Sequence, residues 1–226
     1  MSRRSYAQFC GLAHALDVVG ERWTLLIVRE LATGPKRYTD LADALAGIGT
    51  SLLATRVRQL EADGVIQRRL ATDQPGSAVV YELSPAGREL AAAVVPLALW
   101  GARHQMADAD PEHEAMRAEW LLSFLAAYVR RDGPHDLDAV FEFHIDDSIA
   151  SLRINTGTTS VRPGPSPTPA DATLRTTAKV TAEILGRHTT VDDAIADGRI
   201  EVTGDAAMVA TLLDVIAKEL AAPSLA

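Results

Sequence analysis

Residues 51–83 constrain the fold more than any other part of the chain. Apolar residues recur at helical spacing from residue 51 to residue 63, and Gly64 suits the left-handed position that closes a helix. The spacing then changes to that of strands over residues 65–70 and 79–83, with turn-forming residues 73–76 between them. A helix followed at once by a two-stranded hairpin is typical of the second half of a winged helix-turn-helix.

The flanking segments complete this order of elements. Helical spacing is present over residues 12–19, 23–31 and 38–45. Thr50 is the expected N-cap of the helix over residues 51–63. Ser84 as N-cap and Pro85 at the first helical position open a last helix that reaches about residue 105. We therefore assign residues 1–107 to a winged helix-turn-helix domain, mostly α with a β-hairpin wing, that binds DNA.

The helix over residues 51–63 has two chemically different sides. On a helical wheel, an apolar side made by Leu52, Leu53, Val57 and Leu60 is expected to face the core. The opposite side is polar, and Arg58 is the best candidate to read a base, because arginine can donate two hydrogen bonds to guanine. Residues expected to contact DNA are Lys36, Arg37, Tyr38, Thr50, Ser51, Thr55, Arg56, Arg58, Gln59, Arg68 and Arg69. The alternative is that the basic residues among them only keep an alanine-rich surface soluble.

The charge of the chain is unevenly distributed. A net charge of −8 argues at first against nucleic acid, because DNA repels an acidic surface. Residues 1–105, however, hold 12 basic and 10 acidic side chains, whereas residues 106–226 hold 10 basic and 20 acidic ones. This asymmetry is compatible with a DNA-binding module joined to an acidic second domain.

Residues 10–90 resemble the HxlR branch of winged-helix regulators. The matching residues are Cys10, Leu16, Asp17, Val18, Val19, Gly20, Arg22, Trp23, Thr24, Leu25, Leu26, Ile27, Val28, Gly34, Pro35, Lys36, Arg37, Tyr38, Leu41, Gly47, Ile48, Leu53, Leu60, Asp63, Gly64, Tyr81, Leu83 and Gly87. The resemblance implies a homodimer built from the first and last helices of the domain. It also implies two recognition helices in successive major grooves, about 34 to 36 Å apart.

Cys10 is the only cysteine of the chain. Some members of the resembled family use a cysteine at this place to sense oxidants or electrophiles, which requires an exposed thiol of low pKa. The alternative, which we favour, is that Cys10 packs at a dimer interface beside Phe9 and Leu12.

A second domain is expected over residues 112–226, after a polar, acidic stretch broken by Pro111. Helices are expected over residues 112–131, 178–185, 191–196 and 206–220, and strands over residues 139–145, 149–155, 172–176 and 199–203. Residues 162–170, with four prolines, are expected to form a loop. This order predicts an α+β domain in which helices cover one face of a sheet.

The run from Asp197 to Asp205 resembles the sterol-carrier-protein fold, as does the segment that starts at Asp171. That resemblance implies an apolar tunnel for lipids between sheet and helices. The expected walls are Trp120, Phe124, Phe141, Phe143, Leu174, Ile195, Val202, Met208 and Leu212. The alternative for each is an ordinary core side chain.

Other chemistry is not indicated. We expect no catalytic site and no cofactor, because nucleophile-elbow, phosphate-loop and dinucleotide motifs are missing. Residues 104–113 contain histidines and acids, but we interpret them as a solvated linker and expect no metal site. Glu142 and His144 share a strand face and are interpreted as exposed polar residues. Sparse cysteine use and the lack of a signal peptide or membrane span favour the cytoplasm.

These features favour a homodimeric, operator-binding transcriptional regulator, modulated by an apolar small molecule in the second domain. One alternative keeps the DNA binder but lets the second domain only dimerise or dock a partner. Another is a lipid carrier with a vestigial winged helix. The expected partners are double-stranded DNA, a second copy of the chain and an apolar effector, without a membrane.

Overall fold

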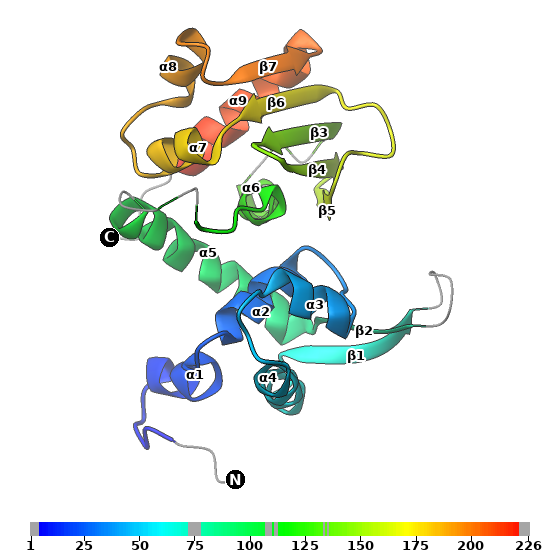
Figure 1. Cartoon of the computed structure of the whole chain (residues 1–226), viewed down its shortest axis with the longest axis vertical. Coiled ribbons are helices and arrows are strands. Elements are labelled where there is room, and N and C mark those ends of the chain that lie inside the picture. Colours follow the sequence, from blue (N-terminus) through cyan, green and yellow to red (C-terminus); the bar gives the residue numbers. More distant parts are fainter. Residues whose placement is uncertain are drawn as a thin grey trace. The chain divides into compact units, whose positions relative to one another are not determined.

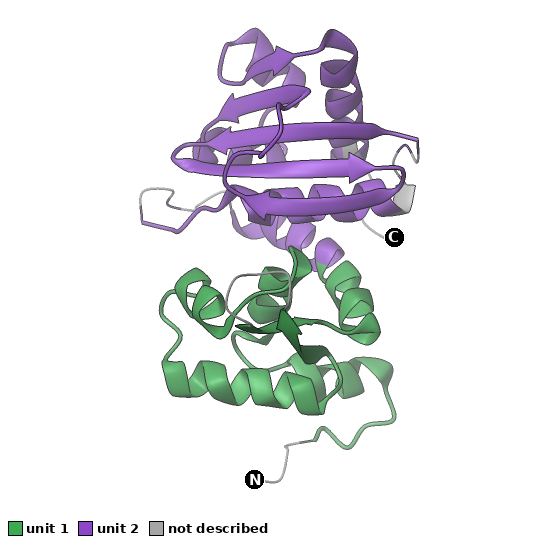
Figure 2. Ribbon diagram, turned by 90° about the vertical axis from the view of Figure 1, so that its right-hand side faces the viewer, with its two compact units in different colours: residues 1–94 green, residues 95–226 purple. Residues whose placement is uncertain are grey.

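A computed structural model describes residues 5–71, 78–106, 110, 113–132, 134 and 136–221. The chain divides into two compact units, residues 1–94 and residues 95–226 (Figure 2). The division lies inside a long helix, α5 (Pro85–Gln105), whereas the sequence suggested a boundary after residue 107. Each unit is described by itself.

The first unit contains four short helices, a hairpin and the first part of α5 (Figure 1). The elements before α5 are α1 (Gly11–Val19), α2 (Thr24–Ala32), α3 (Tyr38–Ala44), α4 (Thr50–Ala62), β1 (Ile66–Ala71) and β2 (Ala78–Leu83). The strands pair antiparallel, from Ile66 opposite Leu83 to Ala71 opposite Ala78. The predicted hairpin turn falls outside the described residues. This is the element order that the sequence predicted for a winged helix-turn-helix.

The ends of α4 and α5 show which capping predictions hold. The predicted N-cap at Thr50 is wrong by one residue: Gly49 is the N-cap, in an extended conformation, and its carbonyl accepts the Leu53 N–H at 2.9 Å. The predicted cap of α5 is confirmed, because the Ser84 hydroxyl accepts the Gly87 N–H at 3.0 Å. A Cβ at Gly87 would lie 2.0 Å from the Val65 carbonyl oxygen, so only glycine lets α5 start this close to β1.

The core of the first unit is built on one side of α4. Leu53, Val57 and Leu60 are buried and pack with apolar residues of α2 and α3. Leu52 is an exception to the prediction, because 36% of it is exposed. Its direction is 100° from that of Leu53 on the wheel, which turns it to the flank of the helix.

The second unit is a five-stranded sheet with helices against one face (Figure 2). Its elements after α5 are α6 (Ala118–Asp132), β3 (Asp138–Ile145), β4 (Ser148–Asn155), β5 (Thr158–Pro163), β6 (Ala172–Thr176), α7 (Ala178–Leu185), α8 (Val191–Ala196), β7 (Glu201–Gly204) and α9 (Ala206–Ala221). The strand order is β5-β4-β3-β6-β7, with β3 and β6 parallel and the other neighbours antiparallel. Helix α6 packs on β3, β4 and β5, while α9 packs on β6 and β7. The predicted α+β class is confirmed.

Two elements of the second unit differ from the prediction. Strand β5 was not expected, and it takes two residues from the predicted proline loop. It is an edge strand ending in Pro163, a place where a missing N–H is tolerated. Helix α6 begins at Ala118, six residues later than predicted, where the Ala118 N–H donates to the Ser148 hydroxyl of β4 at 2.8 Å.

The turn before α9 depends on a glycine. Gly204 has φ +131°, and a Cβ there would lie 2.2 Å from the carbonyl oxygen of Asp171. The next residue, Asp205, donates its N–H to the same carbonyl at 2.8 Å. The Gly-Asp pair found in the sequence thus joins the end of β7 to the start of β6.

Across the described ranges, none of the helices combines the length and apolar character that a membrane crossing would need.

Candidate nucleic-acid interface

The outer side of α4 is polar and accessible. Ser51, Arg58 and Gln59 are exposed and Thr55 is half-buried. The Thr55 hydroxyl donates to the Ser51 carbonyl at 2.8 Å, and Arg58 Nε donates to the Ala54 carbonyl at 3.2 Å. These bonds stay within the helix, so the remaining N–H groups of the Arg58 guanidinium face outward. Such a surface offers donors and hydroxyls of the kind that bind DNA bases and phosphates.

The N-terminus of α4 is held by the preceding helix. The hydroxyl of Tyr38, the first residue of α3, donates to the Thr50 carbonyl at 2.7 Å. Arg37 precedes α3, and its backbone N–H donates to the Asp40 carboxylate at 2.8 Å. Tyr38 was predicted as a DNA contact. In the structure, this hydrogen bond uses the only donor of the Tyr38 hydroxyl and connects α3 to α4.

A backbone bridge brings Lys36 beside the hairpin. Lys36 and Tyr81 exchange two backbone hydrogen bonds, of 2.9 and 2.8 Å, and Tyr81 lies opposite Arg68 in the β1–β2 pair. Lys36 and Arg68, which are 32 positions apart in the sequence, therefore flank the same residue of β2. The sequence placed both near α4 but gave no sign of this bridge.

Two of the predicted DNA-contacting arginines form ion pairs within the unit. Arg56 Nη2 lies 2.7 Å from Glu21 Oε2, and only 14% of the Arg56 side chain is exposed. Arg69 Nε lies 3.0 Å from Glu82 Oε2. Hydrogen bonds from Gln67 and Arg69 hold the pKa of the Glu82 carboxyl below its usual value.

Arg58 and Arg68 differ from this pair. Both are exposed, and neither faces a carboxylate partner among the residues that the structure describes. Among the four arginines of α4 and β1, Arg58 and Arg68 are therefore the two whose charge is not paired with a carboxylate of the described residues. Local sequence could not separate the two kinds of arginine, because Glu21 and Glu82 are far from their partners along the chain.

Apolar side chains are exposed on α1 and its lead-in segment and again on α5. Phe9 is fully exposed, and 69% of Leu12 and 37% of Leu16 are accessible. On α5, Leu97 and Trp100 are more than half exposed. Leu12 and Leu16, like Leu97 and Trp100, follow helical spacing and form a stripe along their own helix, whereas Phe9 lies just before α1. Stripes of this kind are normally covered by a partner.

Cys10 is exposed and is the N-cap of α1. Hydrogen bonds from the backbone N–H groups of Ala13 and Leu12 lower the pKa of its thiol. Within this single chain the thiol does not pack in a core. Both readings of Cys10, as a sensor and as an interface residue, stay predictions.

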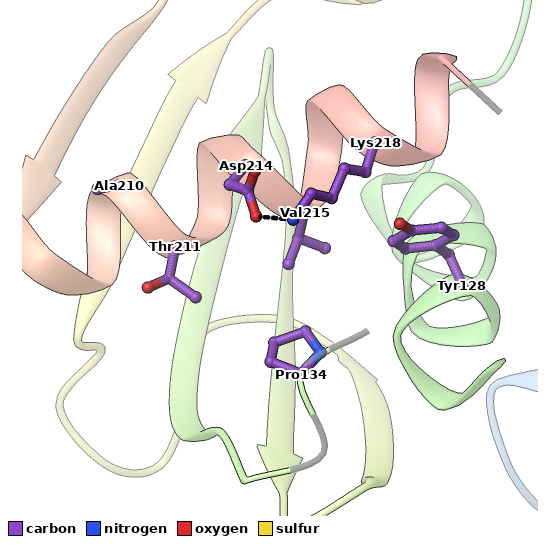
Figure 3. A pocket seen from close by; sticks show the side chains of 7 residues that line it. All are labelled: Tyr128, Pro134, Ala210, Thr211, Asp214, Val215 and Lys218. Carbon is purple, nitrogen blue, oxygen red and sulfur yellow. Dashed lines mark hydrogen bonds and ion pairs between the residues drawn. The ribbon is translucent and has the colours of Figure 1, made fainter. Parts of the chain in front are cut away.

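The second unit has an open cavity of about 530 Å³ between the end of α6 and α9 (Figure 3). It is lined by Tyr128, Pro134, Ala210, Thr211, Asp214, Val215 and Lys218. Lys218 lies 2.7 Å from Asp214, which raises the pKa of the lysine.

The nine predicted tunnel walls do not line this cavity. Phe141, Phe143, Leu174 and Leu212 are buried in the core, and Ile195, Val202 and Met208 pack against it. Trp120 and Phe124 are half-buried. Their role as tunnel walls stays a prediction.

Glu142 and His144 are less exposed than the sequence suggested, with 16% of each side chain accessible. Glu142 Oε1 lies 2.6 Å from His144 Nε2, and Glu142 Oε2 accepts the Ser166 N–H at 2.9 Å. Burial raises the pKa of the Glu142 carboxyl, but the hydrogen bonds from Ser166 and His144 outweigh it and bring that pKa below its usual value. The carboxylate thus ties the proline loop to β3, which is a structural role.

Comparison with known proteins also divides the chain into two parts, but the two matches meet at residue 109, after α5 and not inside it. Residues 18–109 match the model of the HxlR-like helix-turn-helix family, and residues 109–220 match that of the alkyl sulfatase C-terminal family. The match of the second part is thus to a family other than the sterol-carrier proteins that the sequence resembled.

Individual relatives match the first part. The uncharacterized HTH-type transcriptional regulator sll1512 of Synechocystis is 40% identical over 81 residues, which cover 36% of this chain and 59% of the relative. The uncharacterized HTH-type transcriptional regulator YtcD of Bacillus subtilis is 39% identical over 89 residues, covering 39% of this chain and 70% of the relative. The structure of the reduced form of the transcriptional regulator YodB from B. subtilis aligns with a TM-score of 0.38 and 26% identity, over 43% of this chain and 96% of YodB.

Proposed function

The chain belongs to the HxlR-like helix-turn-helix family, and from this premise we propose that it is a homodimer that binds operator DNA and regulates transcription. The proposal depends on one observation, which is that α4 has a buried apolar side and an accessible polar side. Leu53, Val57 and Leu60 are buried in the unit. The accessible side is formed by Ser51, Thr55, Arg58 and Gln59. In a helix-turn-helix, this second helix enters the major groove.

The basic residues around α4 have separate roles in the proposed complex. Arg58 reads a base edge, because it is exposed and forms no ion pair with a carboxylate of the described residues. Its side chain is long enough to donate two hydrogen bonds to guanine. Lys36 and Arg68, joined through Tyr81, contact the phosphate backbone beside the groove. The Ser51 hydroxyl and the backbone N–H groups at the N-terminus of α4 add neutral donors to phosphate.

Dimerisation uses the apolar stripes. Phe9, Leu12 and Leu16 on one side, and Leu97 and Trp100 on α5, are large side chains that water solvates poorly. A second copy of the chain would cover them. Operator sites of such a dimer have two halves, one helical turn of DNA apart.

The second unit is proposed to bind an apolar or amphipathic effector that shifts operator affinity. Support comes from its architecture, in which helices cover one face of a sheet, and from the cavity between α6 and α9. A tunnel of sterol-carrier type, lined by the nine residues named above, is the finer form of this proposal. Native mass spectrometry of the purified protein tests it, because a co-purified apolar molecule is expected. Protein free of any bound molecule would favour a docking or dimerisation role for the second unit.

DNA binding is tested by selecting sequences from a random duplex library and measuring affinity over a salt series. We expect affinity to fall steeply with salt, with a log-log slope of about −0.9 per phosphate contacted. Arg58→Ala should weaken binding to the selected site by about 10- to 100-fold and relax one base preference. The control is Arg187→Ala, an exposed arginine of the second unit. Wild-type protein without salt-dependent DNA binding would contradict the proposal.

A further inference from the structure

Arg56 is the one predicted DNA contact on α4 whose side chain is folded back into the unit. Its guanidinium makes two hydrogen bonds of 2.7 Å, from Nη2 to Glu21 Oε2 and from Nη1 to Gln59 Oε1. Its Nε is buried and meets no acceptor among the described residues. The Arg56 guanidinium, which lies beside the proposed DNA-binding side of α4, is thus paired with a carboxylate of its own chain.

The acceptor, Glu21, is held in place by a tight turn between α1 and α2. The N–H of Gly20 donates to the Leu16 carbonyl at 2.8 Å, and the N–H of Thr24 donates to the Glu21 carbonyl at 3.2 Å. Trp23 follows with φ +79°, a left-handed conformation that a tryptophan keeps only when packing requires it, and its side chain packs on the core. The backbone of Glu21 is therefore fixed by the turn, although 62% of its side chain is exposed.

A phosphate and the Glu21 carboxylate are alternative acceptors for the same guanidinium. Both bind arginine through two planar N–H groups, and both carry negative charge. While Glu21 is bound, the pair is neutral and Arg56 has no charge to offer the DNA backbone. Loss of Glu21 frees Nη2, whereas Nη1 stays bonded to Gln59 and Nε stays buried, so Nη2 is the donor for which a phosphate competes.

We propose, on the basis of the proposed DNA-binding function, that Glu21 keeps Arg56 off the DNA backbone, so that Arg56 positions Gln59 instead of contacting phosphate. Gln59 is held by its carbonyl oxygen, which leaves its two amide N–H donors for the groove. Phosphate contacts add affinity for any sequence, whereas base contacts add it for one. Glu21 is thus a specificity determinant, because it removes a sequence-independent contact.

The test uses a random-sequence duplex as non-specific DNA and compares wild type, Glu21→Gln, Arg56→Gln and the double variant. Releasing Arg56 in Glu21→Gln should add about one phosphate contact, which steepens the log-log salt slope by about 0.9. Between 50 and 200 mM salt, the affinity of Glu21→Gln should therefore fall about 3.5-fold further than that of the wild type. Arg56→Gln should keep the wild-type slope, and the double variant should match Arg56→Gln.

The matched control is Glu61→Gln, which removes the same charge from an exposed residue of α4. It should leave the slope unchanged, and Glu21→Ala should repeat the gain of Glu21→Gln. A Glu21→Gln slope equal to the wild-type slope would overturn the inference, as would a loss of about 0.9 in Arg56→Gln. Wild-type protein that binds no DNA would overturn the proposed function itself, which separates the two failures.

Discussion

The elements up to α5 and those from α6 onward treat large apolar side chains in opposite ways. Through α5, residues such as Phe9, Leu12, Leu70 and Trp100 are more than half exposed. From residue 101 to residue 221, none of the described large apolar side chains is exposed to that degree. The first part leaves apolar surface for a partner, whereas the second part closes its own core.

Charge follows the same division. Residues 1–105 hold 12 basic and 10 acidic side chains, and Arg58 and Arg68 are exposed there without a carboxylate partner among the described residues. The second part holds twice as many acidic as basic residues, 20 against 10 over residues 106–226. The surfaces proposed for DNA and for a second subunit both lie before residue 101, and the following predictions examine this contrast.

The largest effect is expected in the closed core. Phe141 is 1% exposed and packs with the buried residues of the sheet and of α6 and α9. Phe141→Ala should lower the free energy of unfolding of the second unit by about 3 to 5 kcal/mol, because it leaves a cavity. Urea denaturation measures this loss. Met208→Ala, at a half-buried position, should cost clearly less, and equal losses would show that this core is loosely packed.

Dimerisation should depend on the stripe of α1. Leu12→Asp places a charge where the proposed interface excludes water, which should weaken the dimer by at least about 2 kcal/mol, or roughly 30-fold in Kd. Analytical ultracentrifugation measures the change. Leu70→Asp is the matched control, because this leucine of β1 is 63% exposed, against 69% for Leu12, but lies outside the stripes. If both variants dimerise like the wild type, the exposed stripe does not serve assembly.

Substitution of the two arginines of β1 should change the salt dependence of DNA binding by different amounts. Arg68→Ala should make the log-log salt slope of DNA binding shallower by about 0.9, because an unpaired cation contacts phosphate. Arg69→Ala should change it less, since Arg69 already pairs with Glu82. The same titration of both variants tests this order. A larger change for Arg69 would reverse the assignment.

The smallest effect concerns pH. The pKa of Glu82 is lowered in the folded state by Gln67 and Arg69, so its contribution to stability is present above the ordinary value of 4.5 and is lost as pH falls through the folded pKa. Glu82→Gln should therefore lower the free energy of unfolding at pH 7 by less than about 1 kcal/mol, which appears as a slightly lower Tm. Below the folded pKa the substitution should leave Tm unchanged. Thermal unfolding at pH 7 and pH 3 measures both. A Tm difference between wild type and Glu82→Gln that is larger at pH 3 than at pH 7 would contradict this prediction.

Local patterns predicted most elements but not the contacts between distant residues. Helices α7 and α8 have the predicted bounds, and α5 starts at the predicted cap, because periodicity and capping act over a few residues. Strand β5 was missed because Val161 is its only buried residue, so its sequence lacks the apolar alternation that marks a strand.

The same limit applies to the interface. Periodicity identified the polar side of α4, but Arg56 and Arg58 are chemically equal in the sequence. Their difference comes from Glu21, 35 residues before Arg56. The exposure of Leu52 was missed because wheel direction alone does not define how wide the buried side of a helix is.

Hydroxyl-radical footprinting of a selected operator tests the central claim most directly, since that claim places α4 of two subunits in successive major grooves. Two protected segments are expected, with centres about 10 to 10.5 base pairs apart, and both should weaken together in Arg58→Ala. A single protected segment, or a footprint that Arg58→Ala leaves unchanged, would contradict the account.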